Sequence, residues 1–477
     1  MEKLNLAFVT RACGGQLKGP MAEAVFNGVS SDSRHLRPGE IFIALQGGSF
    51  DGHDFLGEAA GRGAAAAIIS NPRKVPDAFR LPVIHVSDTL NALQQLAGDY
   101  RKLMPLRTVA VTGSNGKTST KEMLAALLAE RFQTIKSEGN LNNHIGVPLS
   151  LLRIRPFHEA GVFELAMNHP CELAPLAAMV SPVVGIITNV GPVHLEGMGD
   201  EQGVAREKAA VIAALPLDGV AVLNADNKWT HLLREYTRAR IVTAGLAPDA
   251  NVRAENIRHG DTGVLFDLIL PAMDEHWPGT ASSPTARNEG ATRVAVALHL
   301  LGDHWISNAL LAAGAARVLG LTAAEIALGF EKVALPAMRM QTMVVDEVHW
   351  INDAYNANPH SMEAALNAQV RCPCHGRRVA VLGDMLELGA QSERWHRRIG
   401  AAAARAGVAL LVTVGREGRF IAEAAWTGGL SVDAVVVCDT VNQAAAALLD
   451  RVRAGDCVLV KASRGMKLET LVPQATG

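Results

Sequence analysis

The sequence lacks an excess of charge of either sign. Lys and Arg number 45 against 47 Asp and Glu, so the formal net charge is −2. No global positive field is therefore available to hold nucleic acid or an anionic membrane surface. A dedicated DNA-binding or RNA-binding protein is disfavoured, and neither a nucleic acid nor a membrane is expected as a partner.

Cysteine is also scarce. Six cysteines scattered over 477 residues are too few for a disulfide framework, and reduced thiols are typical of the cytoplasm. Cys372, Cys374 and His375 could supply some of the ligands of a zinc site, but the sequence has no second Cys/His pair with matching spacing. We therefore favour an ordinary surface turn over structural zinc at this position.

Long uninterrupted apolar runs and fixed-period repeats are missing as well. The stretch 173–195 has no Asp, Glu, Lys or Arg and could span a bilayer, but prolines and glycines interrupt it, so buried strands and turns are expected there. The apolar run at 4–9 is short and lacks a cleavage site, which predicts a cytoplasmic protein. Without a repeat, solenoids and propellers are set aside.

The composition and patterning favour a large α/β protein. Hydrophobic residues make up 49% of the chain and charged residues 19%, and at about 150 residues per domain the length predicts about three domains. Short apolar runs alternate with Ala- and Leu-rich helical stretches, which indicates parallel sheets wrapped by helices. The predicted domains are 1–104, 105–335 and 336–477, with a Pro-, Ser-, Thr- and Gly-rich excursion at 271–288 inside the second.

The sharpest motif is the glycine loop TGSNGKT at 112–118, which lies between an apolar strand and a predicted helix. Its glycines let backbone N–H groups approach phosphate oxygens, and the helix N-terminus adds positive potential. Lys117 would reach the terminal phosphates and Thr118 would bind Mg²⁺. Val111 stands where the strict pattern has its first glycine. The predicted nucleoside-triphosphate contacts are Gly113, Ser114, Asn115, Gly116, Lys117, Thr118 and Ser119.

Two further side chains suit the magnesium side of such a site. Glu164 lies in an otherwise apolar strand, where an unpaired buried carboxylate would cost on the order of several kcal/mol. A metal would remove that cost, and a salt bridge to a neighbouring cation is the alternative. His194 follows the apolar strand 183–190, at the edge where α/β folds gather ligands, and its imidazole could supplement oxygen ligands.

Lys208 shares one face of a predicted helix with apolar residues, Val204, Val211, Ile212 and Leu215. Snorkelling of its ammonium to solvent is one interpretation. The other is a partial burial that lowers the pKa, so that the amine reacts with carbon dioxide and the carbamate helps to bind a second metal. The residues alone leave both open.

Three further motifs follow the glycine loop: EGNLNNHIGVP at 138–148, ELAMNH at 164–169 and TNVGPVHLE at 188–196. Together they resemble the Mur ligase family, the ATP-dependent amide-bond ligases of peptidoglycan precursor synthesis. The resemblance covers nearly the whole chain. It implies an N-terminal UDP-sugar-binding α/β domain, a central P-loop ATPase domain with a mostly parallel sheet, and a C-terminal Rossmann-like α/β domain.

The resemblance also implies roles for the unusual residues. Thr118, Glu164 and His194 match the magnesium side of the ATP site, and Lys208 matches a lysine that is carbamylated in several members. ATP and two Mg²⁺ ions, one held through carbamylated Lys208, are thus the implied cofactors. The implied catalytic residues are Lys117, His194 and Lys208.

The two ends of the chain narrow the resemblance further. SSDSR at 30–34 and FDGHDF at 50–55 resemble the UDP-sugar domain of the members that add the third residue or the final dipeptide. DAYNANP at 353–359, LGDMLELG at 382–389 and KASR at 461–464 resemble the dipeptide-adding members, and the Asp-Asn-Pro-Arg motif of the diamino-acid-adding members is absent. The implied reaction joins D-alanyl-D-alanine to UDP-N-acetylmuramoyl-tripeptide through an acyl phosphate.

The same motifs imply further contacts. We expect the C-terminal domain to close over the site and to exclude water from the acyl phosphate. The implied nucleotide contacts outside the glycine loop are Asn308, Arg339, Asp353 and Asn356. The implied substrate contacts are Ser31, Asp32, Ser33, Arg34, Asp51, His53, Asn140, Asn142, Asn143, Lys461, Ser463 and Arg464.

Some alternatives stay open at this point. Three alternatives share the ATP core: a diamino-acid-adding ligase acting one step earlier, a folylpolyglutamate synthase and a non-catalytic scaffold. A P-loop GTPase lacks support, because Asn227 and Lys228 are followed by Trp229 and do not form the Asn-Lys-x-Asp guanine motif. The third residue of the tripeptide is either a diaminopimelate or a lysine, and a monomer is the default expectation.

The chain also departs from the family pattern. Trp305 replaces an asparagine in the usual His-Asn-x-x-Asn near the adenine, and its indole could stack on the base instead. Ala166 and Cys171 stand where glycine is frequent, which could shift the local backbone.

Overall fold

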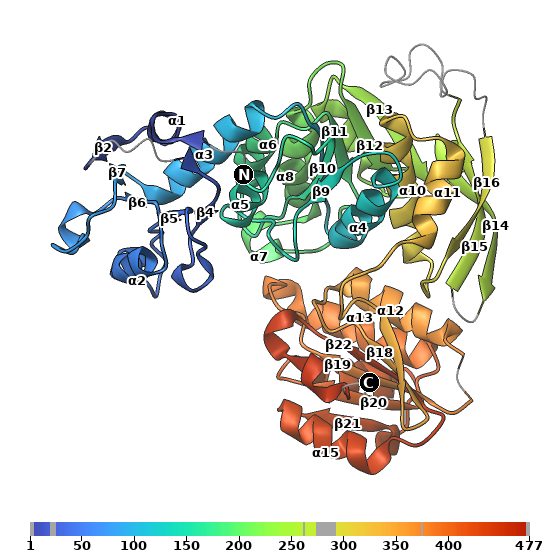
Figure 1. Cartoon of the computed structure of the whole chain (residues 1–477). Coiled ribbons are helices and arrows are strands. Elements are labelled where there is room, and N and C mark those ends of the chain that lie inside the picture. Colours follow the sequence, from blue (N-terminus) through green and yellow to red (C-terminus); the bar gives the residue numbers. More distant parts are fainter. Residues whose placement is uncertain (1–3, 20–24, 261–262, 273–291, 374, 474–477) are drawn as a thin grey trace.

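The computed structural model describes residues 4–19, 25–260, 263–272, 292–373 and 375–473. Its strands form three large sheets in three successive parts of the chain, and helices cover them (Figure 1). The predicted α/β fold with three sheet-containing domains is confirmed. Within the described ranges, no helix has the length and apolar character needed to cross a membrane.

The N-terminal domain is built on a five-stranded sheet of order β2-β7-β6-β5-β4, in which only β2 runs antiparallel to its neighbour. Helix α3 connects this sheet to the central domain. The hydroxyl of Tyr100 on α3 donates a 2.6 Å hydrogen bond to the carbonyl of Ile154 in the central domain. The elements are α1 (Leu6–Ala12), β2 (Gln16–Lys18), β4 (Val29–Ser30), β5 (Ile41–Ile43), α2 (Leu56–Gly61), β6 (Ala66–Ile69), β7 (Val83–His85) and α3 (Thr89–Lys102), and a two-stranded ribbon pairs β1 (Leu4–Asn5) with β3 (Val25–Phe26).

The central domain holds a nine-stranded sheet of order β16-β15-β14-β13-β12-β11-β8-β10-β9. In this order, the strands from β14 to β9, including β8, all run parallel to one another. Strands β15 and β16 pair antiparallel at the other end of the sheet. Their bounds are β8 (Arg107–Thr112), β9 (Thr134–Lys136), β10 (Ala160–Glu164), β11 (Val184–Ile187), β12 (Val220–Asn224), β13 (Arg240–Gly245), β14 (Val252–Gly260), β15 (Gly263–Leu270) and β16 (Thr292–Leu298).

Alternation along the central strands divides the core into two layers. In β8, Val109 and Val111 face one cluster with helices α4 and α10, whereas Ala110 faces the other cluster with α5, α6 and α8. Both faces of the sheet are therefore covered, which explains its nearly continuous apolar strands. The helices are α4 (Lys117–Leu128), α5 (Gly146–Leu151), α6 (Leu173–Val180), α8 (Glu201–Ala213), α9 (Thr230–Leu233), α10 (His304–Val318) and α11 (Ala323–Glu331).

Two predicted segments of the central domain, 173–195 and 271–288, are compared with the structure next. The run 173–195 begins with helix α6 rather than with a strand, because Pro175 lies in the first turn, where a missing N–H is tolerated, and Ser181 ends the helix at φ 48°. Most of the predicted excursion at 271–288 lies outside the described residues. It falls between the antiparallel neighbours β15 and β16.

The C-terminal domain carries a six-stranded sheet of order β17-β18-β22-β19-β20-β21, parallel except for β17. Cys372, just after α12, is buried rather than part of a surface turn, and Cys374 lies outside the described residues. The elements are β17 (Gln341–Val345), β18 (Val348–Asn352), α12 (Pro359–Arg371), β19 (Arg378–Gly383), α13 (Ser392–Arg405), β20 (Leu410–Val414), α14 (Gly418–Thr427), β21 (Val435–Cys438), α15 (Val441–Arg451) and β22 (Cys457–Lys461).

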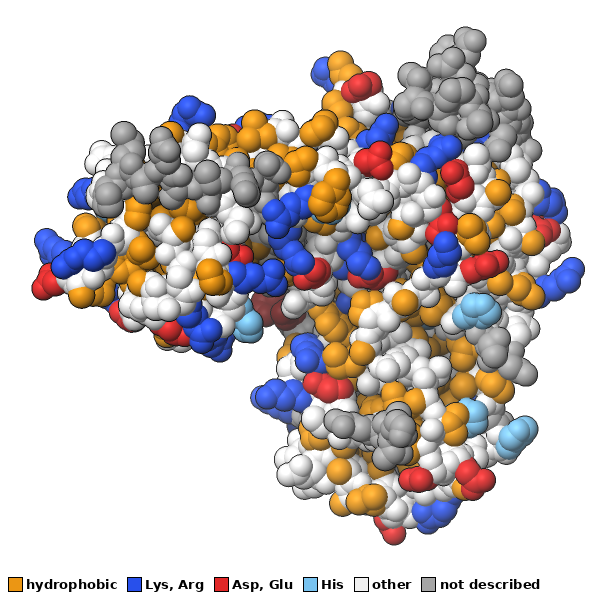
Figure 2. Space-filling model, viewed as in Figure 1, with side chains coloured by type: hydrophobic (Ala, Val, Ile, Leu, Met, Phe, Trp, Pro, Cys, Tyr) orange, Lys and Arg blue, Asp and Glu red, His pale blue; other side chains and the backbone are white. Residues whose placement is uncertain are grey.

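The three domains meet around the central sheet. The N-terminal domain lies to one side of it and the C-terminal domain below it in Figure 1, and a notch opens between these two outer domains in Figure 2. The carboxyl end of β8, where the glycine loop begins, is thereby brought close to the C-terminal domain, as the hydrogen bonds described below show.

Candidate active site

The glycine loop has the backbone that its sequence predicts. Gly113 has φ 152°, and a Cβ there would lie 1.8 Å from the Thr188 Oγ1 atom. Gly116 has φ 77°, and a Cβ there would lie 2.3 Å from the Asn308 Oδ1 atom. Since both positions exclude a side chain, the loop turns tightly into α4, whose N-terminus begins at Lys117.

The segment after β11 supports this loop from the neighbouring strand. The backbone N–H groups of Ser114 and Asn115 donate to the carbonyl and the side-chain oxygen of Asn189, each over 2.9 Å. The Ser114 hydroxyl donates to the Gly191 carbonyl over 3.1 Å. These contacts fix the loop before any ligand binds, so little ordering entropy remains to be lost on nucleotide binding.

Lys117 lies where the sequence predicts a phosphate contact. Its Nζ atom donates to the Gly113 carbonyl over 2.8 Å. Burial lowers the pKa of Lys117, the carboxylate of Glu164 raises it, and the guanidinium of Arg339 lowers it. The ammonium is thus held over the loop, between one negative and one positive neighbour.

Glu164 ends strand β10 and is only 2% exposed. Its Oε1 atom accepts a 2.8 Å hydrogen bond from the Asn142 side-chain amide, whereas its Oε2 atom is buried without a hydrogen-bond partner. The nearest cation is Lys121, whose Nζ atom lies 3.8 Å from Oε2. The salt bridge considered from the sequence is therefore present but long, and one carboxylate oxygen still faces the site without a donor.

His194 begins the short helix α7 (Leu195–Met198) with φ 52°. Its Nδ1 atom lies 2.5 Å from the Oε2 atom of Glu387, which belongs to the C-terminal domain. The imidazole also lines the cavity that the glycine loop faces. The structure therefore brings His194 and Glu164 to one cavity.

Lys208 is buried on α8, with 2% of its surface exposed, so snorkelling to solvent is not observed. Burial lowers its pKa well below the usual value, the nearby ammonium of Lys117 lowers it further, and Glu207 opposes both. These surroundings therefore favour the uncharged amine more than water does. Lys208 does not line the cavity, but it lies close enough to Lys117 for the Lys117 ammonium to lower its pKa.

The cavity has a volume of about 460 Å³. Residues of the glycine loop, the ends of central strands, α10 and the C-terminal domain all contribute to its wall. The predicted residues in this lining are Ser114, Asn115, Gly116, Lys117, Thr118, Ser119, Asn140, Asn142, Glu164, His194, Asn308, Arg339, Asp353, Asn356 and Lys461. Most of the predicted nucleotide residues are thus brought together.

The C-terminal domain contacts the glycine loop directly. Arg339 donates a 2.9 Å hydrogen bond to the Thr118 hydroxyl, and its guanidinium lies 4.1 Å from the centre of the Tyr355 ring. The side-chain amide of Asn358 donates to the side chain of Asn115. The domain is therefore docked on the P-loop.

Asp353 and Lys461 form a buried ion pair in the same wall. The Lys461 Nζ atom lies 2.6 Å from Asp353 Oδ2 and donates to the Asn356 carbonyl over 2.8 Å. Asp353 also accepts a 3.0 Å hydrogen bond from the backbone N–H of Met340. The ion pair thus ties the end of β18 and the end of β22 to the segment that joins the two domains.

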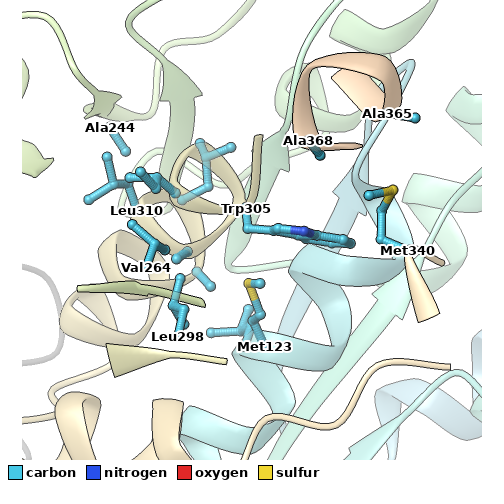
Figure 3. Close-up of a cluster of buried hydrophobic side chains, with 14 of the residues drawn as sticks. Met123, Ala244, Val264, Leu298, Trp305, Leu310, Met340, Ala365 and Ala368 are labelled. Carbon is cyan, nitrogen blue, oxygen red and sulfur yellow. The ribbon is translucent and has the colours of Figure 1, made fainter. Parts of the chain in front are cut away.

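Trp305 contributes to the cavity wall but is almost entirely buried. The side chain is 3% exposed, and its Nε1 atom donates a 3.0 Å hydrogen bond to the Leu301 carbonyl. Figure 3 shows the indole inserted between the central helix α4 and α12, with Met123, Ala368 and Met340 around it. The family asparagine is thus replaced by an apolar contact between two domains.

His304 lies beside this indole, with 4.4 Å between the ring centres, and lines the cavity. Burial lowers the pKa of His304 to about 4; the carboxylate of Asp353 opposes this shift, and the ammonium of Lys461 adds to it. The ring is therefore neutral at physiological pH. Neutral imidazole offers one donor and one acceptor to a ligand.

Several predicted substrate contacts have another role in the structure. His53 is fully buried; its Nδ1 atom pairs with Asp51 over 2.6 Å, and its Nε2 atom accepts from the backbone of Ser70 and Asn71. With both ring nitrogens engaged, His53 links Asp51 to the backbone at 70–71, and its predicted substrate contact stays a prediction.

Three further predicted substrate residues also make hydrogen bonds within the protein. Ser33 is buried and donates to Glu58 over 3.0 Å, and the side chain of Asn143 accepts from the backbone at the start of α5. Ser463 is buried and accepts from the backbone N–H of Leu386 over 2.9 Å. The hydroxyls of Ser33 and Ser463 are thus engaged within their own domains, whereas Asn143 is exposed, and its predicted substrate contact stays a prediction.

Four other predicted substrate residues, Ser31, Asp32, Arg34 and Arg464, do not line the cavity. Asp32 and Arg34 pair through their side chains at the short helix η1 (Ser33–His35), and this bond holds the pKa of Asp32 well below its usual range. Ser31 precedes them in the same exposed loop. Arg464 pairs with Glu469 over 2.9 Å.

Sequence reasoning missed several residues of the site. Lys121 is fully buried in α4, 3.1 Å from Glu122, and Asn189 supports the glycine loop. A lysine one helical turn after Lys117 on a buried helix was the available signal for Lys121. For Glu387 no local signal exists, since its partner lies 193 residues away.

Comparisons with known proteins agree with this architecture. Three family models match: "Mur ligase family, catalytic domain" over 25–101, "Mur ligase middle domain" over 111–316, and "Mur ligase, glutamate ligase domain" over 338–464. The UDP-N-acetylmuramoyl-tripeptide–D-alanyl-D-alanine ligase of Escherichia coli (strain K12) is 35% identical over 477 residues, which cover 99% of this chain and 98% of the relative.

Solved structures resemble the whole chain as well. MurF from Acinetobacter baumannii superposes with a TM-score of 0.86 at 29% identity, over 99% of this chain and 98% of that one. MurF ligase from Thermotoga maritima, solved in complex with ADP, superposes with a TM-score of 0.77 at 25% identity, over 93% of this chain and 96% of that one.

Proposed function

We propose, because this chain belongs to the Mur ligase family, that it joins D-alanyl-D-alanine to UDP-N-acetylmuramoyl-tripeptide with ATP, to give the pentapeptide precursor of peptidoglycan. The observation that carries this proposal is the single cavity in which the glycine loop, Glu164 and His194 meet Arg339 and Asp353 of the C-terminal domain. Curated relatives from Escherichia coli and Bacillus subtilis, which match over 98% of their length, bear the name of this ligase.

We assign a task to each domain. Residues 1–104 would bind the UDP-N-acetylmuramoyl part of the substrate, residues 105–335 would bind ATP, and residues 336–477 would bind the dipeptide and close the site. The notch between the outer domains in Figure 2 supports this division, because it leaves room for a substrate that contacts both of them.

Mg²⁺ fits the residues at the cavity. Glu164 Oε2 is buried without a donor, and the Thr118 hydroxyl and the His194 imidazole line the same cavity. Such an oxygen-rich set with one supplementary nitrogen suits Mg²⁺, which would neutralise charge on the phosphoryl oxygens. Carbamylated Lys208 would add ligands for a second ion, and its burial and low pKa support an amine able to react with carbon dioxide.

The chemistry has two steps. First, the terminal carboxylate oxygen of the tripeptide attacks the γ-phosphorus, an oxygen–phosphorus bond forms, and the bond to the β-phosphate oxygen breaks to release ADP. Second, the amine nitrogen of D-alanyl-D-alanine attacks the acyl carbon, the carbon–oxygen bond breaks, and inorganic phosphate and one proton leave. Lys117 stabilises charge on the transferred phosphoryl group in the first step.

The docked C-terminal domain would protect the acyl phosphate. Arg339 contacts Thr118, and Asn358 contacts Asn115, so the domain covers the glycine loop. Exclusion of water matters because water competes with the amine for the acyl carbon. We further infer action in the cytoplasm, as a monomer, in the cell-wall synthesis on which bacterial shape and division depend.

Phosphate release tests the proposal. Purified protein is given Mg-ATP, UDP-N-acetylmuramoyl-tripeptide and D-alanyl-D-alanine, and each component is left out in turn. We expect rapid release only with all three, together with a pentapeptide product by mass. Release with UDP-N-acetylmuramoyl-dipeptide and a diamino acid instead would place the protein one step earlier, and nucleotide binding without any turnover would indicate a scaffold.

A further inference from the structure

His194 and Glu387 meet across the boundary between the central and C-terminal domains, with 2.5 Å between His194 Nδ1 and Glu387 Oε2. Both residues have a left-handed backbone, at φ 52° and φ 63°. This conformation is disfavoured for His and Glu and persists only where the surroundings impose it. The contact therefore depends on two loops that are each held in an unfavourable backbone conformation.

The loop that carries the glutamate is fixed at the residues just before it. Asp384 accepts hydrogen bonds of 3.0 and 2.8 Å from two backbone N–H groups at the start of α14. The backbone N–H of Met385 donates to the fully buried His396 over 2.9 Å, and that of Leu386 donates to Ser463 over 2.9 Å. The carboxylate is thus presented by a rigid part of the C-terminal domain.

The contact also determines which nitrogen of His194 is available. A carboxylate only accepts hydrogen bonds, so the proton of the neutral imidazole lies on Nδ1 and the lone pair lies on Nε2. The ring lines the cavity next to the glycine loop. Histidines that bind metals usually donate their other ring N–H to a carboxylate in this way, which orients the ring and raises its basicity.

We propose that Glu387 is a positioning residue that holds His194 in the metal-binding tautomer, so that the metal side of the ATP site is complete only while the C-terminal domain is docked. This inference rests on the proposed function, because it takes His194 as a ligand. Coupling between two sites is reciprocal, so metal binding at His194 favours docking of the C-terminal domain by the same factor.

Mn²⁺ serves as the probe for metal binding, measured by electron paramagnetic resonance on the full chain with a non-hydrolysable ATP analogue. Loss of such a carboxylate partner typically weakens metal affinity by about 10–100-fold. We expect Glu387→Ala to raise the Mn²⁺ dissociation constant within that range, and Glu387→Gln to raise it less, because its amide oxygen still accepts from Nδ1. The Glu387 side chain is 57% exposed, so both variants should fold.

Matched variants separate this role from a general charge effect. Glu196 is an exposed carboxylate on α7 at the same domain boundary, and Gly389 of the Glu387 loop approaches it. Glu196→Gln removes the same charge and should leave the Mn²⁺ affinity unchanged. The double variant His194→Ala/Glu387→Ala should bind Mn²⁺ no more weakly than His194→Ala, since the glutamate acts through the histidine.

The outcomes distinguish the inference from its premise. If His194→Ala weakens Mn²⁺ binding and Glu387→Ala does not, the positioning role is wrong while the proposed metal site stands. If neither His194→Ala nor Glu164→Gln weakens Mn²⁺ binding, the proposed metal site fails and the inference fails with it. Small-angle scattering gives a second readout: Mg²⁺ with the analogue should compact the wild type, and this metal-dependent part should be lost in Glu387→Ala.

Discussion

Trp305→Ala tests the finding that this side chain joins two domains. A buried aromatic ring removes about 150–250 Å² from water, and at about 25 cal/mol per Å² this is worth roughly 4–6 kcal/mol. Measured Trp→Ala and Phe→Ala changes in cores cost about 3–5 kcal/mol, because the cavity partly collapses. With 3% of Trp305 exposed, we expect a loss in this second range.

The loss should concern both domains. The indole lies between α4 and α12, so its removal weakens the contact of the C-terminal domain with the central domain as well as the central core (Figure 3). Because Trp305 and His304 line the cavity, the KM for ATP should rise in the same variant. Trp305→Phe keeps most of the ring and loses the hydrogen bond to Leu301, so we expect a cost of about 1–2 kcal/mol.

Urea unfolding followed by circular dichroism measures the stability change. The matched control is Trp426→Ala on α14, where the side chain is 37% exposed and a loss below about 1 kcal/mol is expected. If Trp305→Ala cost no more than Trp426→Ala, the indole would not be a packed contact between domains. A stacking role on the base would then become the better interpretation.

Further variants test the site residues. Lys117→Ala should lower kcat by about 10²–10³-fold or more while UDP-substrate binding, measured by calorimetry, survives; retained turnover would refute the ATP-site assignment. Lys208→Ala should be inactive and partly rescued by short carboxylic acids if a carbamate is the working group, and absence of rescue in a folded variant would favour simple packing. Burial lowers the pKa of His304 from 6.5 to about 4, so the folded state binds fewer protons than the unfolded state between these values, and stability falls as the pH falls. Urea titrations should show the stability difference between wild type and His304→Asn shrinking by up to about 3 kcal/mol over this window, and parallel pH profiles would contradict the assignment.

Local chemistry made part of the site predictable from sequence. The glycine loop, Glu164 and Lys208 stand out because glycines before a Lys-Thr pair, or a charge within an apolar run, have few structural explanations. The alternation of strands and helices likewise predicted the three sheets. These signals all lie within about 10–20 residues of chain, the range over which periodicity can be read.

Features of the site that depend on contacts between distant parts of the chain could not be predicted from the sequence. His53 and Ser463 belong to motifs typical of substrate binding, yet His53 Nε2 and the Ser463 hydroxyl accept from backbone N–H groups that only the folded chain brings near. The packing of Trp305 depends on α12, which belongs to the next domain along the chain. The pairing of His194 with Glu387 requires docked domains, which no local pattern encodes.

The central claim is that the tripeptide carboxylate is activated as an acyl phosphate before the dipeptide amine attacks it. Tripeptide labelled with oxygen-18 in the reacting carboxylate tests this directly when it is incubated with Mg-ATP, D-alanyl-D-alanine and the protein. We predict that the released phosphate carries one labelled oxygen and that the pentapeptide is heavier than the labelled tripeptide by one dipeptide less one oxygen-18-labelled water. Unlabelled phosphate alongside pentapeptide formation would contradict the account, because the carboxylate oxygen would then never have been bonded to phosphorus.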